Sequence, residues 1–193
     1  MAKIFCIANQ KGGVGKTTTA VNLAAGLVAQ NQRVLLIDLD PQGNATMGSG
    51  VNKAELENSV YQVLIGTALA SQALLHASSA GYSVLPANRD LAGAEVELVD
   101  LDNREMRLKL ALNEIEERFD FILIDCPPAL SLLTLNGLCA ADGVVVPMQC
   151  EYFALEGLSD LVNTIKQVHA NLNPGLKIIG LLRVMFDARV TLQ

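Results

Sequence analysis

The sequence predicts an α/β fold, in which a doubly wound, mostly parallel sheet is flanked by helices. Three observations predict it: short apolar runs recur along the chain, stretches with helical spacing of apolar residues separate them, and 51% of the residues are hydrophobic. So high an apolar fraction is typical of strands buried on both faces. At 193 residues the chain is long enough to bury a substantial core, so we expect residues 1–193 to form a single domain.

The first element is a predicted strand, Ile4–Ala8, which a glycine-rich stretch joins to a predicted helix over 19–29. Such a turn brings backbone N–H groups and the positive end of a helix dipole to one point, which is an anion site. Lys16 would reach the β- and γ-phosphates of a nucleotide, and the Thr17 hydroxyl would bind Mg²⁺. The predicted nucleotide-binding residues are Lys11, Gly12, Gly13, Val14, Gly15, Lys16, Thr17 and Thr18.

This loop departs from the common phosphate-loop pattern G-x-x-x-x-G-K-[ST], because Gln10 stands at the position of the first glycine. It carries instead a second lysine, Lys11, ahead of Gly12. The loop wraps away from Lys11, so this cation is placed to serve a neighbouring molecule's nucleotide.

The stretch K-G-G-V-G-K-T resembles the deviant Walker A motif of the ParA/Soj/MinD group of ATPases. The resemblance implies a P-loop NTPase fold with ATP and Mg²⁺ as cofactors. It also implies a homodimer with ATP, in which the first lysine crosses to the partner's nucleotide. Lys11 and Lys16 are therefore both expected to be catalytic.

A second predicted strand, Arg33–Asp38, ends in acidic residues and is followed by a loop with Pro41 and Gly43. Parallel α/β sheets bind ligands beyond the carboxyl ends of their strands, so Asp38 and Asp40 are expected near a triphosphate. A carboxylate there could hold Mg²⁺ through water or orient the attacking water. The run D-L-D-P-Q-G-N is similar to the family's second ATPase motif, which implies that Asp40, and not Asp38, is linked to hydrolysis.

The next part of the chain carries fewer signals. We expect helices over 59–65 and 68–76, then a short strand over 82–86. His76 has no partner in the sequence and is expected to be an ordinary surface residue.

Residues 90–120 carry ten acidic and four basic side chains. Leu108, Leu112, Ile115 and Phe119 recur at helical spacing, which predicts an amphipathic helix over the sheet. The acids are expected to form its solvated face.

In the run Asp120–Asp125, four apolar residues lead to a final aspartate, which is the Walker B arrangement. Asp125 would hold Mg²⁺, usually through a bound water, while Thr17 would bind it directly. Pro127 and Pro128 fix a rigid turn after it, and this loop could register the γ-phosphate. The run D-C-P-P also resembles the family's pattern.

The last elements are a strand over 142–147, a helix over 154–168 and a strand over 176–185. Arg189 follows in D-A-R, similar to a family segment D-A-R-[TS] whose arginine belongs to a non-specific DNA-binding surface. A phosphate contact of this kind is independent of sequence and sensitive to salt. The family continues for about another quarter of its length, so we expect the usual C-terminal segment to be lacking here, as in a chain truncated at that end.

Composition narrows the function. A net charge of −6 argues against a protein whose whole surface binds nucleic acid. A local DNA contact is still permitted near the C-terminal end, because residues 159–193 carry four basic and two acidic side chains. The cysteines, at 6, 126, 139 and 150, form no C-x-x-C pair and are expected to be reduced and mostly buried. There is no signal-peptide pattern and no apolar run near the ~20 residues of a membrane helix, so a soluble, cytoplasmic protein is expected.

Together these features predict an ATP-binding and ATP-hydrolysing dimeric switch in chromosome or plasmid partitioning, with ATP-dependent, non-specific DNA binding. The resemblance implies a nucleoid-associated, slow, Mg²⁺-dependent ATPase, stimulated by a ParB/Spo0J-like protein and without a membrane partner. A MinD-like membrane-cycling ATPase is the alternative, but it needs a Lys/Arg-rich amphipathic C-terminal helix. Two further hypotheses remain: an electron-transfer protein that binds a cluster through cysteines, like the nitrogenase iron protein, and a nucleotide-dependent scaffold that does not hydrolyse ATP.

Overall fold

The structure is a computed structural model that describes residues 1–149 and 154–186, with the side chains of 154–157 left out. Seven strands of the described chain form one sheet, in the spatial order β3-β4-β2-β5-β1-β6-β7. The strands are β1 (Lys3–Ile7), β2 (Val34–Asp38), β3 (Leu75–Ala77), β4 (Tyr82–Leu85), β5 (Phe121–Asp125), β6 (Gly143–Gln149) and β7 (Lys177–Val184). Only the β3–β4 pair is antiparallel among these.

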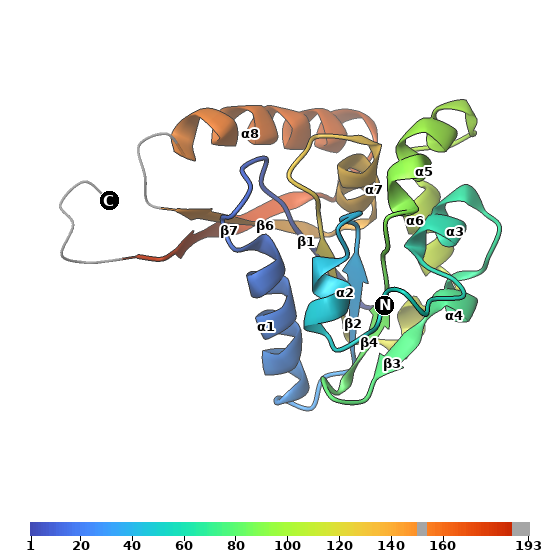
Figure 1. The fold of residues 1–193 in the computed structure, drawn as a ribbon. Coiled ribbons are helices and arrows are strands. Elements are labelled where there is room, and N and C mark those ends of the chain that lie inside the picture. The colour runs from blue at the N-terminus through green and yellow to red at the C-terminus, as the bar shows by residue number, and fades with distance from the viewer. Residues whose placement is uncertain (150–153, 187–193) are drawn as a thin grey trace.

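Helices connect the strands and cover both faces of the sheet (Figure 1). They are α1 (Lys16–Val28), α2 (Asn44–Gly48), α3 (Val60–Ile65), α4 (Ala70–Ala73), α5 (Leu91–Glu97), α6 (Arg107–Leu112), α7 (Leu132–Ala140) and α8 (Ala154–Asn171), with 3₁₀ turns η1 (Leu98–Asp100) and η2 (Glu116–Arg118). This architecture confirms the predicted fold class.

The central strands β2 and β5 are apolar up to their final aspartate because the two faces of the sheet bury alternate residues. On β2, Val34 and Leu36 pack in a cluster with Ala20 and Ala24 of α1. The intervening residues of β2 belong to the larger cluster on the opposite face, to which α3 and α5–α8 contribute. Period-two alternation into two cores explains why these runs carry no polar residue until they end.

The chain changes direction across the sheet at β1 and β5. From β1 it passes over β5 to β2, whereas from β5 it passes over β1 to β6. The carboxyl ends of strands beside such a switch point form a crevice where α/β proteins bind ligands. The loops after β1, β2 and β5 all start at this edge.

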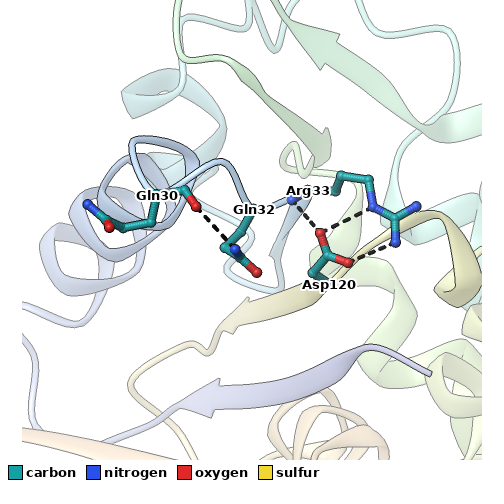
Figure 2. Close-up of polar contacts among 4 residues, drawn as sticks. All are labelled: Gln30, Gln32, Arg33 and Asp120. Carbon is teal, nitrogen blue, oxygen red and sulfur yellow. Dashed lines mark hydrogen bonds and ion pairs between the residues drawn. The ribbon is translucent and has the colours of Figure 1, made fainter.

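An ion pair fixes the opposite ends of β2 and β5. Figure 2 shows the Arg33 guanidinium against Asp120, with Nη2 to Oδ1 at 2.8 Å and Nε to Oδ2 at 3.2 Å, and the Arg33 backbone N–H also donates to Oδ2 at 2.8 Å. The turn before it is held by Gln32 Nε2, which donates to the Gln30 carbonyl at 3.1 Å. The same two strands place Asp38 beside Asp125 in register at their carboxyl ends.

The predicted helix over 68–76 is wrong in its second half. The helical segment α4 is four residues long, and Leu75–Ala77 form β3 instead, paired antiparallel with Tyr82–Val84 of β4. Hydrogen bonding to a neighbouring strand overrides the local helical pattern here. His76 is exposed on this edge strand, as predicted.

The single amphipathic helix predicted within 90–120 is also wrong. Leu108, Leu112, Ile115 and Phe119 are buried, as their spacing predicts, but α6 ends at Leu112, and Ile115 and Phe119 lie directly before and after η2. Two features precede or cap the start of α6. Asn103 has φ +53°, and the Leu108 N–H, in the first turn of α6, donates to Asn136 Oδ1 of α7 at 3.0 Å.

No helix in the described part of the chain is both long and apolar enough to cross a bilayer.

Candidate functional site

The loop between β1 and α1 leaves an open space in front of its backbone. Gly13 and Gly15 have φ of +74° and +79°, a conformation that side chains rarely adopt. A Cβ at Gly12 or Gly13 would meet nothing within 4 Å, and no side chain caps the first turn of α1 after Gly15. The loop is therefore shaped to present backbone N–H groups and the helix N-terminus to an anion.

An open cavity of about 410 Å³ lies at this loop. It is lined by Gly12, Gly13, Gly15, Lys16, Thr17, Thr18, Asp40, Gln42, Asn44 and Pro128. The predicted residues thus meet at the carboxyl edge of the sheet. Pro128 lies in the loop that the sequence predicts to register the γ-phosphate, whereas Gln42 and Asn44 were not predicted as site residues. The signal for these two was their place in the run D-L-D-P-Q-G-N, in the loop that directly follows β2.

Lys16 lies across the mouth of the loop. Its side chain is nearly buried, and Nζ donates to the Lys11 carbonyl at 3.0 Å. Burial lowers the pKa of this ammonium, and the neighbouring carboxylates of Asp125 and Asp40 oppose that shift. The cation is therefore held, beside two acids, where a bound phosphate would be contacted.

Lys11 is positioned differently from Lys16. Its backbone N–H donates to Asn9 Oδ1 at 3.0 Å, and its carbonyl accepts the bond from Lys16. In the described structure its side chain is not among the groups that line the cavity. Val14, the remaining predicted loop residue, is buried and does not line the cavity.

Thr17 and Asp125 meet on the floor of the site. The Thr17 hydroxyl donates to Asp125 Oδ2 at 2.7 Å, while the buried Oδ1 has no hydrogen-bond partner among the described residues. Burial raises the pKa of Asp125 to about 7, against the Thr17 hydrogen bond, and the nearby Asp38 and Asp40 add to the rise. A buried carboxylate oxygen without a partner is costly unless a donor or a cation occupies the site.

These groups fit a magnesium ion bound together with phosphates. Mg²⁺ is usually held by one or two protein oxygens, with substrate phosphates and water completing an octahedron. Thr17 and Asp125 supply such oxygens, and Asp40 lines the same cavity. Over residues 1–149 and 154–186 there is no group of three or more His, Cys, Asp or Glu that could hold a metal ion by protein ligands alone.

The two aspartates after β2 occupy different environments. Asp40 lines the cavity, and its Oδ1 accepts the Gln42 N–H at 2.9 Å. Asp38 is fully buried, where it accepts hydrogen bonds from Thr46 and from the Asp40 N–H. Burial raises the pKa of Asp38 to about 6 despite these bonds. The acid that faces the cavity is therefore Asp40, although its role in hydrolysis stays a prediction.

Two sequence-based expectations concern the cysteines and Arg189. Cys6, Cys126 and Cys139 are buried with free thiols, as expected. The contact with the Cys6 thiol and burial raise the pKa of Cys126 well above its ordinary value, so it is not a reactive thiolate. Arg189 and Cys150 lie outside the described residues.

Comparison with known proteins yields consistent matches. The family profile described as an AAA domain matches residues 2–178. The chromosome partitioning protein ParA of Myxococcus xanthus is 53% identical over 193 residues, which are all of this chain and 68% of that protein. The sporulation initiation inhibitor protein Soj of Bacillus subtilis is 53% identical over 192 residues, 100% of this chain and 76% of Soj.

A solved structure is similar in fold and sequence. It is named cobyrinic acid a,c-diamide synthase from Mycobacterium smegmatis, and it contains an ATP analogue and magnesium. The two chains superpose with a TM-score of 0.95 and 46% identity, over 99% of this chain and 78% of the other.

Proposed function

Because this chain belongs to the ParA/Soj family of ATPases, which share an AAA domain, we propose that it is an ATP-dependent dimeric switch in chromosome or plasmid partitioning. One observation carries the proposal. Lys16, Thr17 and Asp40 line one cavity at a phosphate-binding loop, and Asp125, the last residue of β5, accepts the Thr17 hydrogen bond beside it. The cofactors we propose are ATP and Mg²⁺.

In this proposal the loop binds the nucleotide by its backbone. The N–H groups of Gly12 to Thr17 contact the phosphates, and the Lys16 ammonium exchanges the Lys11 carbonyl for a phosphate oxygen. Thr17 and Asp125 would hold the magnesium ion, which would supply positive charge to offset that of the nucleotide phosphates. Its binding would also give Asp125 Oδ1 a partner.

Asp40 is the residue we propose for hydrolysis. It lines the cavity near Lys16, so its carboxylate can accept a hydrogen bond from a water and orient that water toward the γ-phosphate. A carboxylate that only positions water is a weak base, so unstimulated turnover should be slow. Stimulation by a ParB-like protein would then control the lifetime of the ATP state.

Lys11 is proposed to act in the partner subunit of an ATP-bound homodimer. Its carbonyl is engaged by its own Lys16, while its side chain is not part of the cavity lining in the described structure. A cation supplied in trans can accelerate phosphoryl transfer by ~10³–10⁵. Dimerisation would therefore gate hydrolysis.

DNA binding is the output we propose for the ATP-bound dimer. Arg189 would contact DNA phosphates without sequence preference, which would bring the protein to the nucleoid. A MinD-like membrane-cycling ATPase is the alternative. The chromosome-partitioning name of the M. xanthus relative, which is 53% identical, favours DNA as the surface on which the switch acts.

The synthase name carried by the M. smegmatis structure suggests amide transfer instead. Amide transfer through a cysteine nucleophile would need an activated thiolate. The cysteines of the described part of the chain are buried, and the thiol pKa values of Cys126 and Cys139 are raised. The described residues therefore give this second function no support.

The proposal is tested by sizing the protein with ATP, with ADP and without nucleotide, each with Mg²⁺. We expect a dimer with ATP alone, and loss of that dimer in Lys11→Ala. Lys3→Ala is the matched control, because Lys3 lies at the start of β1 over the Phe121 ring, at the opposite edge of the sheet. A Lys11→Ala protein that dimerises with ATP as the wild type does would rule out the trans role.

DNA binding is tested in the same preparations. The ATP-bound dimer should be retained on non-specific DNA at low salt and released as salt rises. Arg189→Glu should weaken retention without changing ATP affinity. Equal retention of wild type and variant would remove Arg189 from the DNA-binding surface.

A further inference from the structure

A buried polar cluster lies directly behind Asp40. Asp38 and Thr46 are both fully buried. Asp38 Oδ2 accepts the backbone N–H and the hydroxyl of Thr46, both at 2.8 Å, and Asp38 Oδ1 accepts the Asp40 N–H at 3.1 Å. The Thr46 oxygen in turn accepts the Ala87 N–H at 2.9 Å. The hydroxyl thus uses its one proton and one lone pair in a continuous chain of hydrogen bonds.

This cluster joins three segments of the fold. Asp38 is the last residue of β2, Thr46 lies in α2, and Ala87 follows the end of β4. The loop that carries Asp40 also packs closely against Ala87 at Gly43. A Cβ at Gly43 would lie 2.8 Å from the Ala87 carbonyl oxygen. The loop from Asp38 to Thr46 is therefore held at both ends, and Asp40 is the part of it that borders the cavity.

From this geometry we propose that Asp38 and Thr46 are a positioning pair for hydrolysis: their hydrogen bonds fix the backbone at Asp40, and thereby the direction of its carboxylate. The inference rests on the proposed function, in which Asp40 orients the attacking water. Neither Asp38 nor Thr46 lines the cavity, so neither is a catalytic residue.

The size of the expected effect follows from the geometry required of a water-positioning group. Displacement of such a group by about 1 Å can cost ~10²-fold in rate. Removal of the Thr46 hydroxyl leaves Asp38 Oδ2 with one donor fewer and the Ala87 N–H without its acceptor. The loop from Asp38 to Thr46 is then free to shift, while the phosphate-binding loop, which lies between β1 and α1, keeps its contacts.

A purely structural role is separable from a positioning role, because the next residues of the chain offer a matched hydroxyl. Ser49, just after α2, is also buried, and its Oγ donates to the Ala45 carbonyl at 2.7 Å and lies 3.0 Å from the Tyr82 hydroxyl. Its hydroxyl forms no hydrogen bond with Asp38 or Asp40 in the described structure. Ser49→Ala therefore removes a buried hydroxyl of the same segment without touching the positioning pair.

The experiment compares Thr46→Val, Thr46→Ser, Ser49→Ala and Asp40→Ala with the wild type. Steady-state phosphate release gives kcat and KM, calorimetric titration gives ATP affinity with Mg²⁺, and thermal unfolding gives stability. For Thr46→Val we expect kcat to fall about tenfold, with KM and ATP affinity within about twofold of wild type. Thr46→Ser, which restores the hydroxyl, should recover kcat to within about threefold. Ser49→Ala should lower the unfolding temperature and leave kcat unchanged.

The outcomes separate this inference from the function on which it rests. A wild-type kcat in Asp40→Ala would overturn the proposed hydrolytic role itself. An impaired Asp40→Ala beside a normal Thr46→Val would overturn the positioning pair alone, as would equal losses of kcat in Thr46→Val and Ser49→Ala. If Thr46→Val does not fold, Asp38→Asn takes its place, because the amide keeps the size of the side chain but cannot accept all three bonds. A wild-type kcat in folded Asp38→Asn overturns the inference.

Discussion

The Thr17 hydroxyl donates a hydrogen bond of 2.7 Å to Asp125 Oδ2, which joins the first turn of α1 to the end of β5. The other carboxylate oxygen of Asp125 is buried and has no hydrogen-bond partner in the described residues. The bond also orients the carboxylate. Loss of a group that binds or orients a metal ligand commonly costs roughly 10–100-fold in metal affinity.

The first prediction concerns this pair. Thr17→Val removes the hydroxyl at nearly constant volume, and we expect at least about tenfold weaker ATP binding in the presence of Mg²⁺. Binding measured in a chelator should change much less, because the backbone contacts to phosphate remain. Thr17→Ser, which keeps the hydroxyl, should bind like the wild type. Calorimetric titration with and without Mg²⁺ checks this. If Mg²⁺ strengthens ATP binding by the same factor in Thr17→Val as in the wild type, the Thr17 hydroxyl is not a magnesium ligand.

The second prediction concerns Lys16. Its ammonium is held at the loop by the Lys11 carbonyl and lies beside Asp125 and Asp40, so a triphosphate would exchange a neutral acceptor for a charged one. Lys16→Ala should lower ATP affinity about a hundredfold or more, as expected for loss of a charge-assisted contact to phosphate. The lysine at the far end of β1 provides the control, since Lys3→Ala should titrate normally. Equal affinities in the two variants would contradict the phosphate-loop assignment.

The third prediction separates binding from hydrolysis. Asp40 lines the cavity but is not part of the phosphate-binding loop, so Asp40→Ala should bind ATP with about wild-type affinity and release phosphate at least about tenfold more slowly. Because the ATP state would then persist, the variant should stay dimeric for longer after ATP is added. Phosphate release and sizing measured on one sample check both parts. A normal release rate would remove Asp40 from the mechanism.

Most of the site follows from the sequence because its residues sit at the ends of strongly apolar strands. Asp125 ends β5, and Lys16 begins α1, so chain position alone brings them together in a parallel sheet. The polar cluster of Thr46 was not predictable in this way. Its hydroxyl becomes important only because tertiary folding buries it between Asp38 and Ala87, which are 8 and 41 residues away in sequence.

The same distinction explains the two wrong elements. Leu75–Ala77 have a helical pattern locally, but β4 offers them hydrogen bonds, and the pairing decides their structure. Leu108 to Phe119 show the correct buried face, yet α6 begins only at Arg107, where Asn136 of α7 accepts the Leu108 N–H, and it ends at Leu112; no local pattern reveals the contact with Asn136. Periodicity therefore predicts which face is buried more reliably than it predicts where a helix begins or ends.

The fourth prediction compares two glycines under the same substitution. Gly43 has φ +64°, and a Cβ would lie 2.8 Å from the Ala87 carbonyl oxygen, so Gly43→Ala should destabilise the protein by about 1–3 kcal/mol. Gly26 is an exposed position inside α1, where a Cβ would meet nothing within 4 Å. Gly26→Ala should stabilise by about 0.5–1 kcal/mol. Urea unfolding of both variants checks this, and shifts of the same sign would contradict it.

The fifth prediction concerns the Arg33–Asp120 pair and pH. Two guanidinium bonds and the Arg33 N–H lower the pKa of Asp120 from its ordinary 3.8 to about 2. Between these values the unfolded chain binds a proton at Asp120 that the folded chain does not. The stability that the pair contributes is therefore present above about pH 4 and is lost as pH falls toward 2.

A double-mutant cycle isolates this effect from the other acids of the protein. Asp120→Asn, Arg33→Gln and the double variant should show a coupling in urea unfolding at about pH 6 that fades as pH falls below about 4. The coupling should also shrink in high salt, because the Arg33 side chain is 60% exposed. A coupling that grows on acidification would contradict the lowered pKa of Asp120. If the coupling stays constant down to about pH 2.5, the Arg33 side chain does not change the pKa of Asp120, and the backbone N–H of Arg33 is what lowers it.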